Sequence, residues 1–222
     1  MELLRNLNEL IFPSRCVACG ELGLSLCSLC RKGWHLHLYE RKIGGNSATQ
    51  LTVISSVIYS TVAQKIIVGA KESHLHQCDL LVSEAITHAL SRFLTYSSVN
   101  FLIPIPSRKS AVRLRGREFI AEMASDGARR FNIPIAAPFI HTRRVKDQTG
   151  LHLKERWNNV EGAFVVEREH GLHGNVLLID DLVTTGATLC EAARALRYAG
   201  IEVVGAVTAA IAQPLRYRDE MG

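Results

Sequence analysis

Val176-Leu177-Leu178-Ile179-Asp180-Asp181-Leu182-Val183-Thr184-Thr185-Gly186-Ala187-Thr188 is the stretch that decides the fold. Its first four residues are apolar and predict a buried strand over residues 175–179, which delivers two adjacent carboxylates to its exposed end. The run then passes through hydroxyl-bearing residues into a predicted helix over residues 185–199, which Gly200 closes. A strand, a tight turn and a helix in this order are typical of an α/β protein.

The turn between this strand and helix has the chemistry of a phosphate site. Backbone N–H groups at the start of a helix, with the helix dipole behind them, form an anion cradle, and a glycine lets the backbone approach a phosphate closely. The carboxylates Asp180 and Asp181 accept hydrogen bonds when ionised, so they suit the two vicinal hydroxyls of a ribose. The predicted ligand is therefore ribose 5-phosphate, and the alternative is a buried strand and helix cap that happen to include two acids. The predicted 5′-phosphate ligands are Thr184, Thr185, Gly186, Ala187 and Thr188.

Four of the six cysteines lie close together, as Cys16 and Cys19 followed by Cys27 and Cys30. Two Cys-X-X-Cys turns separated by a short loop present four sulfurs to one centre, which is the arrangement of a tetrahedral zinc site. The alternative is a pair of disulfides, which rarely persist in a reducing compartment. A zinc ion with all four positions filled by protein leaves no open site for catalysis, so a structural role or a platform for a partner is predicted.

The rest of the chain alternates between β-branched runs and helical periodicity. Strands and helices in alternation predict a largely parallel, doubly wound sheet with ligands at the carboxyl ends of its strands. We expect an N-terminal helix and the four-cysteine element in residues 1–45, and the α/β domain in residues 46–222. The polar stretch 41–50 is interpreted as a linker and residues 146–159 as a mobile loop. Further helices are predicted over residues 3–11, 62–70, 77–96 and 117–131, and further strands over residues 49–59, 100–105, 139–145, 160–166 and 202–211.

Composition sets limits on the class of protein. The 222 residues, 47% hydrophobic and 21% charged, suffice for one core and a small appendage. No stretch approaches the roughly 20 apolar residues of a membrane span, and the N-terminus lacks the apolar core of a secretory signal. A cytoplasmic protein without membrane insertion is predicted. The net charge of +5 is unevenly placed, and a basic cluster suits an anionic ligand. This cluster consists of Arg108, Lys109, Arg113, Arg115 and Arg117.

The segment 176–188 resembles the phosphoribosyl pyrophosphate (PRPP) motif of type I phosphoribosyltransferases at every position. The chain as a whole is similar to the ComF family, whose members join this domain to an N-terminal four-cysteine zinc element. The resemblance implies a type I phosphoribosyltransferase-like, doubly wound, mostly parallel sheet, and a role in natural transformation (DNA uptake) or a related intracellular role. Besides the cysteines it is carried by Lys71, Ile103-Pro104-Ile105-Pro106, Arg115-Gly116, Arg144, Gln148, Leu151, Arg156, Asn159 and Gly162-Ala163-Phe164.

The chain departs from the ComF pattern at one place. The family usually follows Arg-Gly with an aromatic residue, then Asn and Gln, whereas Arg117, Glu118 and Phe119 follow Arg115-Gly116 here. The departure bears on any acceptor or partner contact that the family makes at these positions.

The resemblance also implies the pyrophosphate half of a PRPP site. In type I enzymes a loop after an earlier strand binds the pyrophosphate, and Ser107, Arg108 and Lys109 lie in the matching place, with Lys71 as a further candidate. The alternative for these residues is a solvated basic loop. Mg²⁺ shared by pyrophosphate and sugar oxygens would accompany PRPP. Asp180 and Asp181 are the predicted catalytic residues.

A loop that contains Arg144, Gln148 and Arg156 would close over the ligand, or Arg156 and Asn159 would pin that loop to the sheet. No general base is evident. His141 and His152 are candidates, although an isolated histidine near a loop is more often a surface residue.

Three classes of function stay open. The protein is a phosphoribosyltransferase with an unidentified acceptor, a PRPP or nucleotide sensor without turnover, or an accessory that contacts single-stranded DNA or a DNA-uptake helicase/ATPase. The sequence separates them poorly, because binding PRPP requires the same residues as using it. We expect a transferase-like domain that serves DNA uptake.

Overall fold

The structure is a computed structural model that describes residues 14–45, 49–73, 75–107, 109–141, 162–167 and 171–213. Its main sheet has five strands in the order β1-β2-β7-β6-β3. These strands are β1 (Tyr39–Ile43), β2 (Leu51–Ile58), β3 (Phe101–Pro104), β6 (Asn175–Val183) and β7 (Glu202–Ile211). The pairs β2–β7, β7–β6 and β6–β3 are parallel, and only β1 runs antiparallel to its neighbour β2. The prediction of a mostly parallel sheet is confirmed.

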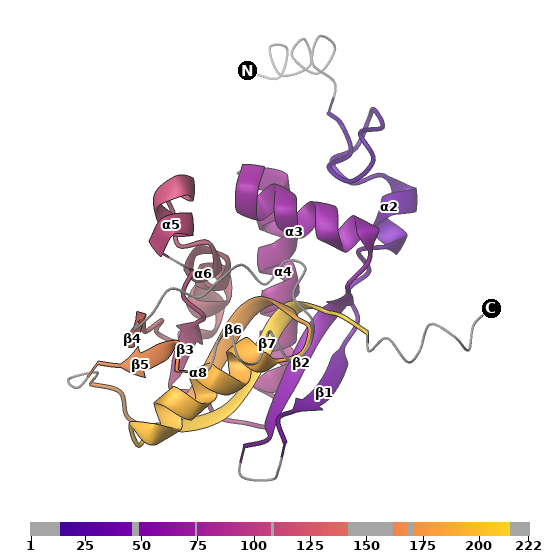
Figure 1. Cartoon of the computed structure of the whole chain (residues 1–222). Helices are drawn as coiled ribbons and strands as arrows, with labels where there is room; N and C mark the ends of the chain where they lie inside the picture. Colours follow the sequence, from indigo (N-terminus) through magenta and orange to yellow (C-terminus); the bar gives the residue numbers. More distant parts are fainter. Residues whose placement is uncertain are drawn as a thin grey trace.

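Helices cover both faces of the sheet (Figure 1). On one face lie α3 (Thr61–Ser73), α4 (His76–Phe93) and α6 (Phe119–Phe131), and on the other lies α8 (Ala187–Tyr198). Each face has its own apolar core, because successive side chains of a strand point to opposite faces. In β6, Leu177 and Ile179 belong to the α3–α4–α6 side, whereas Val176 and Leu178 belong to the α8 side. The doubly wound arrangement is therefore confirmed.

Smaller elements complete the described chain. They are α2 (Ser28–Lys32) in the cysteine element, α5 (Lys109–Arg115) before α6, and a separate antiparallel pair made of β4 (Phe139–His141) and β5 (Phe164–Val166). The two short helices were not predicted from the periodicity, since neither is long enough to repeat an apolar face. No helix among the described residues has the length and apolar character needed to cross a membrane.

The interpretation of residues 41–50 as a linker is wrong for its first part. Residues 39–43 form the edge strand β1, whose pairing with β2 runs from Tyr39 opposite Ser55 to Ile43 opposite Leu51. An edge strand buries little of its surface, so polar residues such as Arg41 and Lys42 are compatible with it. The division of the chain at residue 45 stays a prediction, and β1 on its N-terminal side is part of the main sheet.

Strand β6 is longer than predicted. It continues past Ile179 through both aspartates to Val183, because β7 still offers partners there, with Asp180 opposite Thr208 and Val183 opposite Ile211. Since β2, β3, β6 and β7 are parallel, their carboxyl ends meet at one edge of the sheet. The predicted helix over residues 3–11 and the predicted loop over residues 146–159 lie outside the described residues.

Candidate functional site at the carboxyl edge of the sheet

The predicted phosphate loop encloses a small hollow between β6 and α8. The hollow has a volume of about 40 Å³ and is lined by Asp180 and by residues 182–189, so all five predicted phosphate ligands take part. Gly186 is the N-terminal cap of α8 and has a φ of 82°, a conformation that side chains other than glycine rarely adopt. A Cβ atom there would also lie 2.5 Å from Ile43 Cδ1. Glycine is therefore required at this position for two independent steric reasons.

Strand β1 supports the loop from outside. Arg41 Nη1 donates to the carbonyl of Thr184 at 2.8 Å, and Arg41 Nη2 donates to the carbonyl of Ala212. The N–H of Ala212 in turn donates to the carbonyl of Val183 at 2.9 Å. Sequence reasoning missed this contribution of Arg41, and no local signal reveals it, because Arg41 and Thr184 are 143 positions apart. These hydrogen bonds fix the backbone at the start of the loop.

The two adjacent aspartates differ in their surroundings. Asp180 lines the hollow beside the loop. Asp181 does not line it and is 8% exposed. Its Oδ2 accepts a hydrogen bond from Lys71 Nζ at 2.7 Å, and its N–H donates to Asp180 Oδ1 at 2.9 Å. Lys71, predicted as a candidate for pyrophosphate binding, is thus paired with the second aspartate in the structure.

These contacts drive the two carboxyl pKa values apart. Burial and the charge of Asp181 raise the pKa of Asp180 well above its ordinary value. Burial alone would also raise the pKa of Asp181, but the charge and hydrogen bond of Lys71 outweigh it and lower that pKa. The pKa of Lys71 is raised, since Asp181 outweighs the opposing effect of burial. Two neighbouring acids with opposite pKa shifts are typical of a functional site.

Other elements bring further residues to this edge. Ser107 lies just beyond β3, which is paired with β6 up to Ile179, and the N–H of Ile105 donates to the carbonyl of Ile179 at 2.8 Å. Tyr59 follows β2 at the same edge, and its pKa is raised by burial and by the charge of Asp181. Sequence reasoning missed Tyr59, because nothing local distinguishes a tyrosine at a strand end.

Several predicted site residues are not tested by the structure. Lys109 begins α5, but its side chain is outside the described part of the chain. His141 ends β4, and its side chain is likewise not described. Wholly outside the described residues are Arg108, Arg144, Gln148, His152, Arg156 and Asn159.

The four cysteines Cys16, Cys19, Cys27 and Cys30 form a second site, in the element that precedes β1. Their sulfur atoms all lie within 4.8 Å of one another, and Cys19 Sγ and Cys27 Sγ are 3.7 Å apart. Zn–S bonds of about 2.3 Å in a tetrahedron place sulfurs about 3.8 Å apart, so the arrangement fits such an ion. The structure has all six cysteines as free thiols, so the four of the cluster are not paired as disulfides in it.

The thiols of this cluster also have divergent pKa values. Burial would raise the pKa of Cys16, but N–H donors from Cys27, Cys19 and Ala18 lower it to about 6. Burial and the three neighbouring cysteines raise the pKa of Cys30 to about 12. Four thiolates in one place repel each other, and a divalent cation removes that repulsion.

The cysteine element packs against the first turns of α3. Lys65 Nζ donates to the carbonyl of Ala18 at 2.7 Å, and Ser60 Oγ donates to the carbonyl of Gly33 at 3.1 Å. Cys16, Trp34 and other buried residues of the element belong to the same apolar core as α3 and α4. The element is therefore an extension of the main core.

Comparison with known proteins adds to this geometry. Residues 121–220 match the family model of the phosphoribosyl transferase domain. The matched residues include the loop, both aspartates and α8. The cysteine cluster lies on the N-terminal side of the matched residues.

Two curated relatives match over part of their length. Adenine phosphoribosyltransferase 1 of Triticum aestivum is 31% identical over 93 residues, which cover 40% of this chain and 51% of that protein. Competence protein F of Haemophilus influenzae is 32% identical over 108 residues, which cover 46% of each chain. The chain thus spans about half the length of the curated relatives it matches. A solved adenine phosphoribosyltransferase is 10% identical with a TM-score of 0.44, covering 88% of this chain and 96% of that one.

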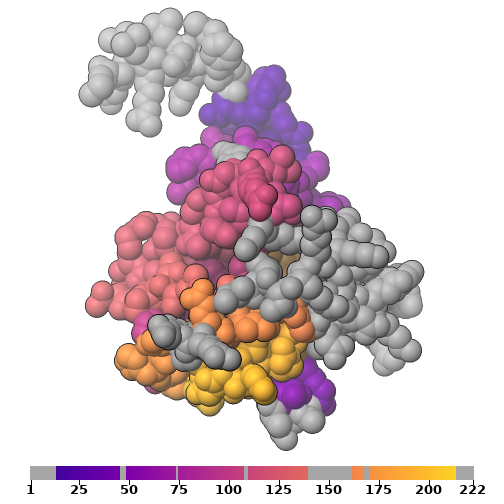
Figure 2. Space-filling view, turned by 60° about the vertical axis from the view of Figure 1, so that its left-hand side comes forward, coloured from indigo at the N-terminus to yellow at the C-terminus, as the bar shows by residue number. Residues whose placement is uncertain are grey.

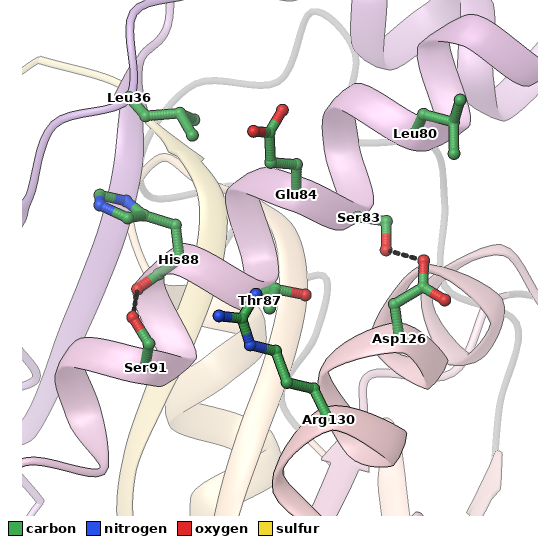
Figure 3. A pocket seen from close by; sticks show the side chains of 9 residues that line it. All are labelled: Leu36, Leu80, Ser83, Glu84, Thr87, His88, Ser91, Asp126 and Arg130. Carbon is green, nitrogen blue, oxygen red and sulfur yellow. Dashed lines mark hydrogen bonds between the residues drawn. The ribbon is translucent and has the colours of Figure 1, made fainter.

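The protein also has a larger hollow, of about 540 Å³, which is lined by other residues than the phosphate loop. Figure 3 shows it across α4, between Leu36 and the α6 residues Asp126 and Arg130. Ser83 Oγ donates to Asp126 Oδ2 at 2.6 Å and joins the two helices there. The lining of this larger hollow contains charged side chains of both signs and none of the predicted PRPP ligands. We assign the candidate site to the smaller hollow, because it lies at the start of α8 and is lined by all five predicted phosphate ligands and by Asp180.

Proposed function

We propose that the protein binds PRPP together with Mg²⁺ and transfers its ribose 5-phosphate to an acceptor. The observation that carries the proposal is the preformed loop 184–188 at the start of α8, with Asp180 lining the same hollow. A loop of this kind suits a phosphate, and a carboxyl beside it suits the ribose hydroxyls. The match of this segment to a phosphoribosyl transferase domain supports the same conclusion.

Each part of the site has a role in this proposal. The N–H groups and threonine hydroxyls of residues 184–188 hold the 5′-phosphate, and Asp180 and Asp181 hold the ribose diol. Lys71 neutralises Asp181 and lies near the expected place of the pyrophosphate. Ser107, Arg108 and Lys109 bind the pyrophosphate, and a loop with Arg144, Gln148 and Arg156 excludes water. Mg²⁺ bound with PRPP supplies positive charge to the leaving pyrophosphate.

We further propose that Zn²⁺ occupies the cysteine cluster in a structural role. Four thiolates satisfy its coordination, so the ion has no open position for a substrate. The fit of the sulfur separations and the attachment of the element to α3 support this assignment.

A role in natural transformation is the biological part of the proposal. It is supported by the likeness to competence protein F. In this role the protein would act in the cytoplasm and contact single-stranded DNA or a DNA-uptake helicase/ATPase. If PRPP binds without turnover, a sensor is the conclusion instead.

The test uses two glycines with the same backbone conformation. Gly186 and Gly200 have φ values of 82° and 81°, but only Gly186 is crowded, since a Cβ at Gly200 would meet nothing within 4 Å. We expect Gly186→Ala to weaken Mg²⁺–PRPP binding, measured by calorimetry, by at least about 10-fold, because the loop must shift. Gly200→Ala should leave the affinity unchanged.

Turnover is measured separately, as pyrophosphate released from PRPP with candidate bases as acceptors. If pyrophosphate is released and Asp180→Asn abolishes this release, the protein is a transferase. PRPP binding without release would favour the sensor. Absence of PRPP binding, with salt-sensitive binding of single-stranded DNA that survives Asp180→Asn, would replace the proposal by a DNA-handling role.

A further inference from the structure

Arg117, which departs from the family pattern, is tied to two acids. Its side chain is 12% exposed. Nη1 and Nη2 donate to Asp79 Oδ2 and Oδ1 of α4 at 2.9 and 2.8 Å, and Nη1 also donates to Glu122 Oε2 at 3.1 Å. A bidentate, largely buried arginine–carboxylate pair is geometrically specific. Arg117 is therefore directed into the protein, which corrects the expectation that the whole basic cluster faces an anionic ligand.

The same guanidinium caps the end of α3. Arg117 Nη2 donates to the carbonyl of Ala70, in the last turn of that helix. The last carbonyls of a helix lack partners within the helix, and a cation there is favourable. Arg115 donates to both carboxylate oxygens of Glu72 in the same turn, at 3.2 and 2.8 Å. Residues 70 and 72 are thus each held by an arginine, and Lys71 lies between them.

Phe119 completes the contact between Arg117 and Lys71. Its ring is fully buried, with the Arg117 guanidinium 5.3 Å and Lys71 Nζ 5.9 Å from the ring centroid. Cations at such distances from an aromatic face are attracted to it. The ring therefore helps to keep the lysine ammonium near the helix end.

Gly116 lets both arginines reach α3. It has a φ of 73° and directly follows α5, and its N–H donates to the carbonyl of Val112 at 2.7 Å. Figure 2 shows α5 lying against the magenta segment that contains α3 and α4. We call Arg115, Arg117, Glu72 and Asp79 the arginine clamp.

We propose that Arg117 is a positioning residue, and that the arginine clamp fixes the last turn of α3 so that Lys71 stays against Asp181. The proposal rests on the proposed function for its effect on PRPP, since Arg117 itself touches no expected ligand atom. It also gives Arg117 and Phe119 a role inside the protein, in place of an acceptor or partner contact.

A loosened clamp changes the charge of the acid pair. Asp181 faces Lys71 from α3, Asp180 from β6 and Tyr59 from the end of β2, and Arg115 acts on it through Lys71. Lys71 is the only cation among these direct neighbours that lowers the pKa of Asp181. Withdrawal of Lys71 leaves a buried carboxyl, which takes up a proton at higher pH.

The test compares Arg117→Gln with Arg129→Gln. Arg129 lies on α6, the helix that follows Arg117, and also pairs with an acid, Asp126, but it is 72% exposed. We expect Arg117→Gln to weaken PRPP binding about 10-fold and to move its loss on acidification to higher pH, with no change for Arg129→Gln. Arg117→Lys keeps one cation near Ala70 and should give an intermediate loss of PRPP affinity. This variant replaces Arg117→Gln in the test if the glutamine variant does not fold.

A double-mutant cycle with Lys71→Met separates positioning from general damage. If Arg117 acts through Lys71, the two changes together should cost little more than Lys71→Met alone. Additive losses in folded variants would overturn the proposal.

A titration of Asp181 by carbon NMR, without any ligand, tests the clamp independently of the function. A higher pKa of Asp181 in Arg117→Gln than in the parent is expected, and an unchanged titration in that folded variant would contradict the clamp. Failure of the parent protein to bind PRPP would contradict the proposed function but not the arginine clamp.

Discussion

The cysteine cluster and the Asp180–Asp181 pair are both groups of ionisable side chains that are close in sequence, but they are organised differently. In the cluster, four sulfurs converge within 4.8 Å, and the thiols perturb one another. In the acid pair, Asp180 lines the hollow, whereas Asp181 accepts a hydrogen bond from Lys71, which is 110 positions away in the sequence. Local spacing is thus enough to build a metal site, whereas the charge of the acid pair depends on a distant partner.

Helix α3 connects the two regions. Its start receives the cysteine element through Lys65, and its end presents Lys71 to Asp181. We therefore expect loss of the cysteine cluster to disturb the first turns of α3, and the acid pair to be affected only by changes in the last turn of that helix.

The largest effect is expected from loss of the metal. Cys16→Ser removes one of four ligands, and structural zinc supplies an apparent ~10–16 kcal/mol in finger peptides, so the parent should hold one zinc and the variant none. Hydrogen exchange should rise in residues 14–34 and at the start of α3, and stay unchanged in β6 and β7. Cys190→Ser, outside the cluster, serves as the control. If the parent protein binds no metal, the prediction of a zinc site in the cluster is wrong.

A smaller effect is expected from breaking the Lys71–Asp181 pair. Lys71→Met leaves the 11% exposed Asp181 side chain without its cation, and should cost about 3 kcal/mol of unfolding free energy at neutral pH. Asp181→Asn leaves the more exposed lysine unpaired and should cost about 2 kcal/mol. Urea unfolding measures both. Equal and negligible losses would show that the pair is only a surface contact.

The smallest effect, of opposite sign, is expected from Asp180→Asn. The raised pKa of Asp180 means that its ionisation opposes folding, so the asparagine variant should be more stable by about 1 kcal/mol at neutral pH. The gain should be absent below the ordinary aspartate pKa of about 3.9, grow as the pH rises from there toward the folded pKa of Asp180, and be complete above it. Asp181 behaves oppositely, since its lowered pKa gives stability that is lost as the pH falls. Thermal melting across this range checks the sign, and a destabilised Asp180→Asn would contradict it.

Much of the fold followed from sequence periodicity. Strand β7 was predicted with its observed bounds, and α4, α6 and α8 differ from prediction by a few residues at their ends, because helix ends depend on caps as much as on apolar repeats. Strand β1 was missed, since an edge strand needs few apolar residues, and the length of β6 was missed because it depends on pairing with β7. The loop 184–188 was found because a local run of residues makes the whole turn.

The sequence by itself determined the cysteine cluster, the phosphate loop and the alternation of strands and helices, since each is set by residues a few positions apart. Only the tertiary structure decided which cation faces Asp181, that Arg41 and Ile43 support the loop, and that Arg115 and Arg117 point inward to α3. The reason is physical: hydrogen bonds and charges act over a few ångströms in space, and packing brings together residues whose separation along the chain carries no information about their contact.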